Sequence, residues 1–112
     1  MKEIKAYVRP GMADRVISEL ESAGIKGMTI LDVSTLGGWI DPEKSKLSME
    51  YCEKYCSSLK IELVCEDSEV NKFVNIILEK AHTGDKGDGK IFVSDVIDSI
   101  SIRTKKHGTE AL

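Results

Sequence analysis

The sequence has no long hydrophobic run and no excess of positive charge. No stretch approaches the roughly 20 apolar residues of a membrane span, and the first residues, MKEIKAYVRP, are charged and lack the apolar region of a signal peptide. We therefore expect a cytoplasmic protein without direct membrane insertion. The formal net charge is -3 and no basic stripe or tail stands out, which argues against DNA or RNA as a partner.

The sequence also has few cysteines and no recognisable set of catalytic residues. Cys52, Cys56 and Cys65 are an odd number in a chain without an export signal, so we expect free thiols rather than a disulfide framework. A reversible disulfide between Cys52 and Cys56, or a metal site that adds His82 or Cys65, is the less favoured alternative because the spacing fits no zinc motif. No serine, histidine and acid set has a recognisable catalytic context, which argues against an enzyme.

The length and composition of the chain indicate one globular domain over residues 1–112. Hydrophobic residues make up 41% and charged residues 31% of the chain, enough for a modest single core. Strict alternation of apolar and polar residues predicts a half-buried strand over 2–9. Apolar residues recur every three or four positions over 12–23, which predicts an amphipathic helix that ends at Gly24.

The same two patterns predict the remaining elements of the chain. They indicate strands over 27–36, 59–65 and 90–96, a helix over 68–82 capped by Ser68, and strand-like alternation over 98–104. Between them, residues 37–58 have a double glycine, a proline, many charges and no sustained period. We interpret this segment as a long structureless loop, which in a compact domain is usually functional or disordered.

The order strand, helix, strand, loop, strand, helix, strand predicts an α+β, ferredoxin-like βαββαβ fold with one antiparallel sheet. Both helices are expected on one face of that sheet. The other face also carries apolar residues that nothing in so short a chain covers, so we expect self-association. Proteins with this fold have many different functions, so the function has to be inferred from particular residues rather than from the fold.

One stretch, HTGDKGDGKIFV over 82–93, combines three glycines with four charged residues in front of a strand. Gly84, Gly87 and Gly89 permit positive φ angles and close approach of the backbone, and successive N–H groups in such a loop can hold an anion, with Lys86 and Lys90 adding charge. A plain surface turn explains the same residues, because aspartate and glycine favour turns. The spacing alone leaves both interpretations open.

Four stretches together resemble a known family: GMTILDV at 27–33, KIELV at 60–64, TGDKGDGKIFV at 83–93 and IRT at 102–104. They are similar to the PII signal-transduction family, the GlnB- and GlnK-like regulators of nitrogen metabolism. The resemblance implies a homotrimer of ferredoxin-like subunits that binds an adenine nucleotide, ATP, ADP or AMP, in clefts between subunits. It also implies a T-loop over about 37–58, a B-loop over about 82–90 and a C-terminal loop over about 102–112.

The resemblance carries over to individual residues. It implies a nucleotide-binding set made of Thr29, Gly37, Gly38, Glu62, Val64, Gly87, Asp88, Gly89, Lys90 and Arg103. In this set the backbone of 87–89, the Lys90 ammonium and the Arg103 guanidinium hold the phosphates, and a planar guanidinium suits phosphate well. The remaining residues lie around the adenine or at the base of the T-loop.

Departures from the family pattern fall on residues that handle charge. Gly38 and Trp39 stand where the family typically has arginine and glutamine, Ser58 replaces a lysine and Ser101 replaces an arginine. The family uses that glutamine to hold the magnesium ion that 2-oxoglutarate chelates, so 2-oxoglutarate sensing in its usual form is not expected. The loss of two arginines makes ADP and AMP candidates beside ATP, and leaves magnesium undecided.

The resemblance further implies that the T-loop docks on a membrane transporter of the ammonium-channel type or on a regulated enzyme. Trp39 is then an interface anchor, a platform for the adenine ring, or a residue that packs on the subunit body. Tyr51 coincides with a tyrosine that some relatives uridylylate, although a plain loop tyrosine fits its surroundings better. Two alternative functions remain: a sensor of another metabolite, such as bicarbonate or a carboxylate, and a structural trimeric module with a decayed nucleotide site.

Overall fold

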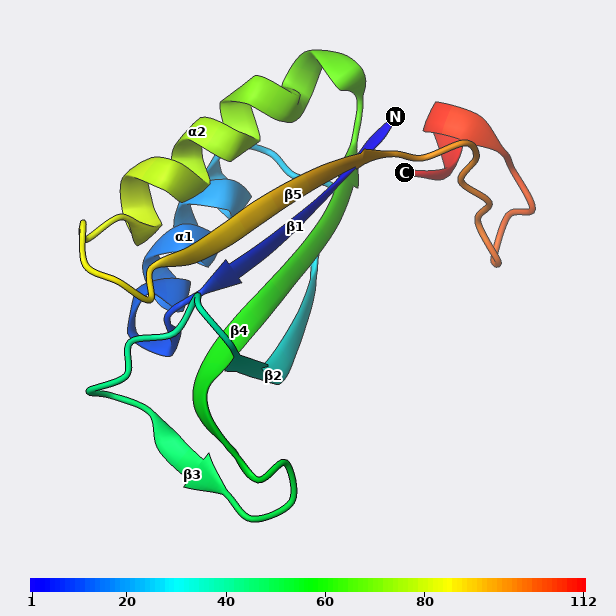
Figure 1. The fold of residues 1–112 in the computed structure, drawn as a ribbon. Coiled ribbons are helices and arrows are strands. Elements are labelled where there is room, and N and C mark those ends of the chain that lie inside the picture. Colours follow the sequence, from blue (N-terminus) through cyan, green and yellow to red (C-terminus); the bar gives the residue numbers. More distant parts are fainter.

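The computed structural model describes residues 1–112 as two helices packed on one antiparallel sheet (Figure 1). The strands are β1 (Lys2–Val8), β2 (Thr29–Leu36), β3 (Lys46–Ser48), β4 (Glu53–Cys65) and β5 (Gly89–Asp95). The main strands lie in the order β2-β4-β1-β5, and β3 pairs with β4. This is the ferredoxin-like arrangement that the order of sequence patterns predicts, which confirms the α+β assignment.

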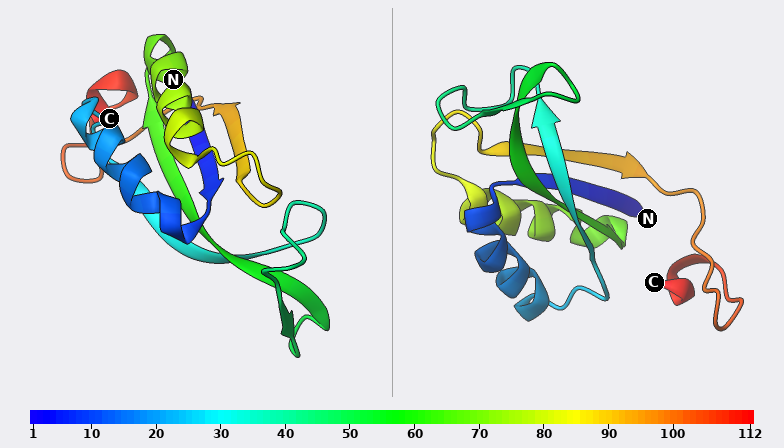
Figure 2. Two further views of the ribbon diagram at one scale, coloured as in Figure 1. Left: turned by 90° about the vertical axis from the view of Figure 1, so that its left-hand side faces the viewer. Right: turned by 90° about the horizontal axis from the view of Figure 1, so that it is seen from below.

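The two helices cover one face of the sheet, as Figure 2 shows. They are α1 (Pro10–Ser22) and α2 (Val70–Ala81), and their buried side chains meet the inward-facing residues of β1 and β4. The largest fully buried side chains are Phe73, Ile4, Leu20, Ile61, Ile77 and Val16. The apolar residues that give β1 its period of two and α1 and α2 their helical spacing therefore all pack in this single core. Neither helix is long and apolar enough to cross a membrane.

The ends of the helices differ in part from the sequence prediction. α1 begins with Pro10 at its first position, where the missing N–H costs nothing, and Gly24 follows its end with φ at 88°. The prediction that Ser68 caps α2 is wrong. Ser68 lies inside a short 3-10 turn, η1 (Asp67–Glu69), and a capping box between Glu66 and Glu69 starts the helical segment instead.

Residues 37–58 are not structureless, which corrects the prediction of one long loop. They contain β3 and the first six residues of β4, which begins at Glu53 rather than near 59. Tyr55 pairs with Leu36 of β2 on one edge and with Lys46 of β3 on the other. The polar start of β4 shows no clear alternation of its own, so the extension depends on pairing with β2 and β3, which the local pattern does not reveal.

The strand-like alternation over 98–104 does not form a strand, because the chain leaves the sheet after β5. Residues 96–112, called the C-terminal arm below, contain one isolated bridge between Ile100 and His107 and a 3-10 turn, η2 (Gly108–Ala111). The arm stands apart from the body of the domain (Figure 1). Ile97 and Ile102 are 99% and 96% exposed, so nothing in the chain itself covers them.

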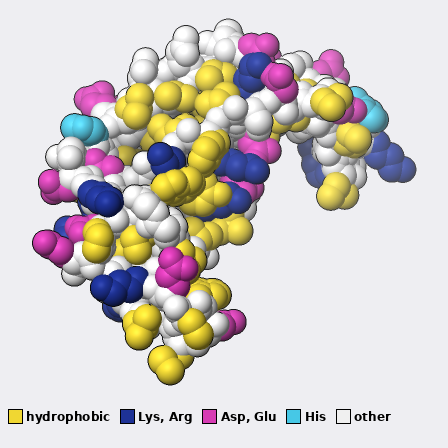
Figure 3. Space-filling model, in the orientation of Figure 1, with side chains coloured by type: hydrophobic (Ala, Val, Ile, Leu, Met, Phe, Trp, Pro, Cys, Tyr) yellow, Lys and Arg dark blue, Asp and Glu magenta, His cyan; other side chains and the backbone are white.

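The face of the sheet opposite the helices carries charged pairs as well as apolar side chains. Lys60 contacts Glu62 at 2.6 Å and Lys5 contacts Glu3 at 3.2 Å on this face. On the side of the molecule that Figure 3 shows, apolar and charged side chains are mixed, and a separate apolar group lies on the arm. No helix packs on this face, but Trp39 covers part of it by packing on Tyr7 and Phe92. The expectation of an uncovered face is therefore correct only in part, and the composition of the face is mixed rather than uniformly apolar.

Candidate functional site

Residues 82–90, which comprise the segment between α2 and β5 and the first two residues of β5, are called the glycine loop below. Gly84, Gly87 and Gly89 have φ angles of 91°, 102° and 107°, a region that side chains other than glycine rarely adopt. Gly89 also has no space for a side chain, because an added Cβ would lie 1.7 Å from the carbonyl oxygen of Tyr7. The close approach follows from the pairing of Val8 with Gly89 at the end of the β1–β5 ladder.

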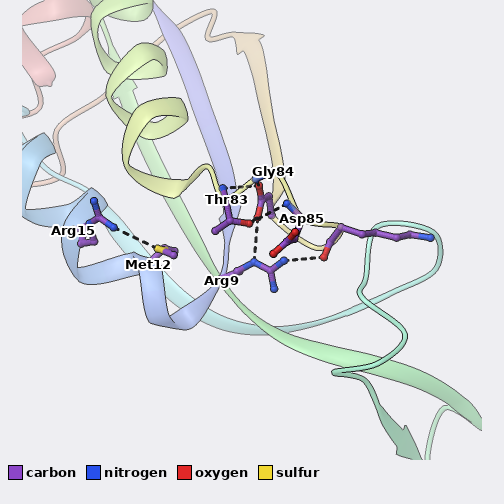
Figure 4. A network of polar contacts seen from close by, with 8 residues as sticks. Arg9, Met12, Arg15, Thr83, Gly84 and Asp85 are labelled. Atoms are coloured by element: carbon purple, nitrogen blue, oxygen red, sulfur yellow. Dashed lines mark hydrogen bonds and ion pairs between the residues drawn. The ribbon is translucent and has the colours of Figure 1, made fainter.

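The Asp88 carboxylate holds the glycine loop together. It accepts hydrogen bonds from the backbone N–H of Thr83 and of Gly84, both at 2.8 Å, from the Thr83 hydroxyl, and from Arg9 Nε at 3.2 Å (Figure 4). Burial by itself would raise the pKa of Asp88, but the bonds from Thr83, Gly84 and Arg9 outweigh it and hold that pKa far below the usual range. Asp88 is therefore a charged acceptor that shapes the loop.

Arg9 is a site residue that sequence reasoning missed. Besides its bond to Asp88, its Nη2 donates to the carbonyl of Lys86 at 2.7 Å, and its side chain is only 18% exposed. A Cβ on Gly87 would lie 3.2 Å from the same Nη2. Only the register of β1 with β5 places the residue after β1 beside the loop that precedes β5, so no local signal in the sequence identifies Arg9.

The glycine loop keeps hydrogen-bond donors free. No hydrogen bond within the chain uses the backbone N–H groups of Lys86, Gly87 or Asp88. Lys90 follows at the start of β5, and its ammonium forms no salt bridge within the chain. Unpaired N–H groups in a loop with positive φ angles, next to a free ammonium, have the chemistry of an anion site.

An aromatic cluster made of Tyr7, Trp39 and Phe92 lies beside Lys90. The Trp39 ring centroid is 5.8 Å from that of Tyr7 and 5.6 Å from that of Phe92, and Lys90 Nζ is 5.3 Å from the Trp39 ring centroid. Of the roles considered for Trp39, packing on the subunit body is therefore the one that this single chain displays.

Four predicted residues do not join the glycine loop within one chain: Thr29, Glu62, Val64 and Arg103. Thr29 pairs with Glu62 across β2 and β4, and Val64 lies two residues further along β4. β2 and β5 are opposite edges of the sheet, so Lys90 lies three strand spacings, about 14 Å, from the β2 edge. Arg103 is exposed on the C-terminal arm, beyond the other end of β5.

Glu62 forms an ion pair, and the other predicted residues, Gly37, Gly38 and Tyr51, lie in turns. The hydrogen bond from Lys60 lowers the pKa of Glu62 and raises that of Lys60. Gly37, with φ at 91°, and the exposed Gly38 follow the end of β2. Tyr51 lies in the turn between β3 and β4 and is 50% exposed.

A cavity of about 270 Å³ opens between the end of β1, segment 37–46 and the start of β4. Three cationic side chains line it, those of Arg9, Lys44 and Lys46, against one acidic side chain, that of Asp41. Trp39 and Ser58 are also among its walls. The Ser58 hydroxyl accepts a hydrogen bond from Thr35 Oγ1 at 3.2 Å. Cations outnumber anions in the lining, although Arg9 is already paired with Asp88, so the charge of the cavity favours small anions over cations.

The residues here do not fit a protein-bound magnesium ion. Trp39 offers no oxygen ligand, and the Asp88 carboxylate already accepts four hydrogen bonds. No group of three or more histidine, cysteine, aspartate or glutamate side chains is placed to hold a metal ion. The three cysteines are free: Cys52 is exposed, Cys56 is half-buried in β4, and burial raises the pKa of the Cys65 thiol.

Known proteins resemble this chain over its whole length. A family model described as nitrogen regulatory protein P-II matches residues 1–106. The chain is 40% identical over 112 residues to nitrogen regulatory protein P-II 1 of Methanothermobacter thermautotrophicus, with 97% of that protein covered. It is 39% identical to the nitrogen regulatory protein P-II of Microchaete diplosiphon, with both chains covered in full.

A solved structure agrees with these sequences. The crystal structure of Arabidopsis thaliana PII bound to citrate matches with a TM-score of 0.79 and 34% sequence identity, covering 99% of this chain and 91% of that one. Family members named in this way are signalling proteins rather than enzymes. Family model, relatives and fold all lead to one conclusion: this chain belongs to the P-II family of nitrogen regulatory proteins.

Proposed function

We propose that the chain works as a homotrimeric regulator that binds an adenine nucleotide, ATP, ADP or AMP, in clefts between subunits. The observation that carries this proposal is the distribution of the predicted nucleotide set. Its members lie on the glycine loop, on or just after β2, on the neighbouring β4, and on the C-terminal arm of one chain. Three copies arranged in a ring bring different edges of neighbouring chains together, and each cleft then receives a complete set.

In this proposal the glycine loop of one subunit holds the phosphates. The free N–H groups of Lys86, Gly87 and Asp88 and the Lys90 ammonium supply the donors and the charge. Arg103 of a neighbouring subunit adds a bidentate guanidinium. Thr29, Glu62 and Val64 surround the adenine, while Gly37 and Gly38 line the base of the T-loop.

The proposed nucleotide site works without 2-oxoglutarate. Ser58 carries no positive charge and is already hydrogen-bonded to Thr35, and Trp39 cannot coordinate a magnesium ion. The chelate of magnesium, ATP and 2-oxoglutarate therefore lacks both its metal ligand and its carboxylate partner. A regulator that follows the balance of ATP, ADP and AMP fits these residues better.

The T-loop, about 37–58, is proposed as the surface that contacts the partner, a transporter of the ammonium-channel type or a regulated enzyme. Its hairpin tip exposes apolar side chains: Leu47 is 66% exposed and Met49 is 86% exposed. Tyr51, at the same tip, is accessible for modification. The three free thiols accord with the reducing cytoplasm as the site of action.

A second candidate function is a sensor of another small anion, such as bicarbonate or a carboxylate, with nucleotide as co-ligand. The cavity lined by Arg9, Lys44 and Lys46 favours it. A metabolite of this kind would raise the melting temperature only when nucleotide is present.

Isothermal titration calorimetry with ATP, ADP and AMP, each with and without magnesium and 2-oxoglutarate, tests the proposal. We expect binding of at least one nucleotide with an affinity that 2-oxoglutarate leaves unchanged. Enhancement by 2-oxoglutarate would identify an ordinary nitrogen sensor, in which other groups compensate for Trp39 and Ser58. Absence of all nucleotide binding would contradict the proposal and favour a structural trimeric module.

A further inference from the structure

Lys90 and Trp39 form a contact that the predicted role of Lys90 does not explain. The ammonium lies 5.3 Å from the centroid of the indole ring, within the range of a cation–π interaction, and indole is the strongest ring for this purpose. Trp39 itself packs against Tyr7 and Phe92, whose ring centroids lie 5.8 Å and 5.6 Å from its own.

The strand register explains why the contact forms. Lys90 is paired with Tyr7 across β1 and β5 and lies on the same face as Phe92, two residues further on. Trp39 comes from the segment that leaves β2 and covers this group. The ring therefore joins the glycine loop to segment 37–46, and a backbone contact supports the junction, since a Cβ on Gly87 would lie 3.2 Å from the Asp41 nitrogen.

The ring and a phosphate would compete for the same ammonium. Lys90 forms no ion pair within the chain, and the indole face is the ring that its ammonium contacts. A hydrogen bond between an ammonium and a phosphate oxygen is stronger than an exposed cation–π contact. A phosphate seated on the free N–H groups of the glycine loop would draw Lys90 away from Trp39.

We propose that Trp39 sets the affinity of the nucleotide site by holding Lys90 in the empty protein, and that phosphate binding releases Trp39 and so alters segment 37–46. The inference rests on the proposed function, because it takes the ligand to be a nucleotide held at the glycine loop. It assigns Trp39 the role of a positioning residue that acts through Lys90. Contact between Trp39 and the adenine ring is the rival role, and the two differ in the sign of a measurable effect.

The test is calorimetric titration of ADP into the full-length wild type and the Trp39→Leu variant. Removing the competing ring should tighten ADP binding about two- to fivefold, the factor that an exposed cation–π contact represents. In a Lys90→Met background, Trp39→Leu should leave the affinity unchanged, since no ammonium remains to be released. Tyr51→Leu, which removes an exposed aromatic ring from the hairpin tip away from Lys90, serves as the matched control and should leave the affinity unchanged.

Each other outcome overturns the proposal in a recognisable way. Weaker binding by Trp39→Leu would show that the ring contacts the nucleotide, and an unchanged affinity would show that it does not restrain Lys90; the proposed function survives both. If wild-type protein binds no ADP, ATP or AMP, the inference falls together with the proposed function. Should Trp39→Leu not fold, Trp39→Phe keeps the packing on Tyr7 and Phe92 with a weaker cation contact, and must tighten binding by a smaller factor.

Fluorescence gives a second readout because Trp39 is the only tryptophan. In wild type, ADP should shift the Trp39 emission with the same midpoint as the calorimetric titration. In Lys90→Met protein saturated with ADP, that shift should be lost. A shift of the same size in both proteins would contradict the role of Lys90.

Discussion

The glycine loop and the C-terminal arm are both irregular and both carry residues of the proposed nucleotide site, yet they differ in how they are held. Asp88 receives four hydrogen bonds that fix the loop, one of them from Arg9. The arm is tied mainly to itself, through the Ile100–His107 bridge and the contact of His107 with Asp98 at 2.8 Å. Its isoleucines Ile97 and Ile102 face solvent.

This difference indicates which part of the site one chain completes alone. The loop is formed by the fold of its own chain, and in the proposal it holds the phosphates. The arm exposes apolar surface that a monomer does not normally leave open, so we attribute its final position to a neighbouring subunit. Four predictions, ordered from the largest expected effect to the smallest, test this contrast.

Gly89→Ala should destabilise the protein by at least about 3 kcal/mol, because strained backbone is combined with a clash against β1. The added Cβ would meet the Tyr7 carbonyl oxygen at 1.7 Å. Urea unfolding measures the loss. Gly11→Ala, in α1 with nothing within 4 Å of the added Cβ, is the matched control and should be neutral or stabilising. Equal stability of both variants would contradict the close packing of the loop on β1.

Lys90→Ala and Arg103→Ala should each weaken nucleotide binding by about 1.5–3 kcal/mol, or about 10- to 150-fold, the value of a charged hydrogen bond. The residues lie in the two contrasted regions, one on the anchored loop side and one on the exposed arm. Calorimetry measures both affinities. An unchanged affinity for Arg103→Ala alone would remove the arm from the site and restrict it to the loop.

Ile102→Asp should weaken the trimer by about 1.5–3 kcal/mol per subunit, the value of burying such a side chain. Sedimentation velocity over a dilution series measures this effect. Leu47→Asp is the control, because Leu47 is also exposed, at 66%, but lies on the hairpin that we assign to the partner. If Ile102→Asp leaves the trimer as stable as Leu47→Asp does, the arm does not pack between subunits.

Asp88→Asn should cost about 1–2 kcal/mol of unfolding free energy at pH 7, since the lost charge weakens the bonds that shape the loop. The pKa of Asp88 is lowered in the folded protein, so its stabilising effect is complete above the unfolded pKa near 3.9 and is lost as the pH falls below it. The gap between wild type and variant should therefore narrow below about pH 4. Asp85→Asn is the control, and a gap that persists at acid pH would contradict the ionised role.

Much of the fold follows from local patterns. The period of two over 2–9 and the helical spacing over 12–23 and 68–82 predict elements that the structure contains with small shifts at their ends. Such patterns succeed because one face of each element packs on the single core. They fail over 37–58, where β4 begins early by pairing with its neighbours, and over 98–104, where alternation without a partner strand gives an exposed arm.

The candidate site was predictable only in part. The glycines and Lys90 stand together in the sequence, so the loop is visible as a possible anion site. Arg9 is 79 residues from Asp88 along the chain, and Trp39 meets Lys90 from a different segment. These contacts depend on strand register and on the path of segment 37–46, which no local signal contains. Contacts of this kind need the folded chain.

A subunit-mixing experiment tests the central claim, that each nucleotide site is shared between two chains. Lys90→Ala and Arg103→Ala chains are combined in equal amounts by co-refolding, and ADP binding is titrated. If Lys90 comes from one subunit and Arg103 from the next, about a quarter of the interfaces regain both residues, and a class of sites with wild-type affinity reappears. If both residues act within one chain, no mixed trimer has a complete site, and the absence of this class would contradict the account.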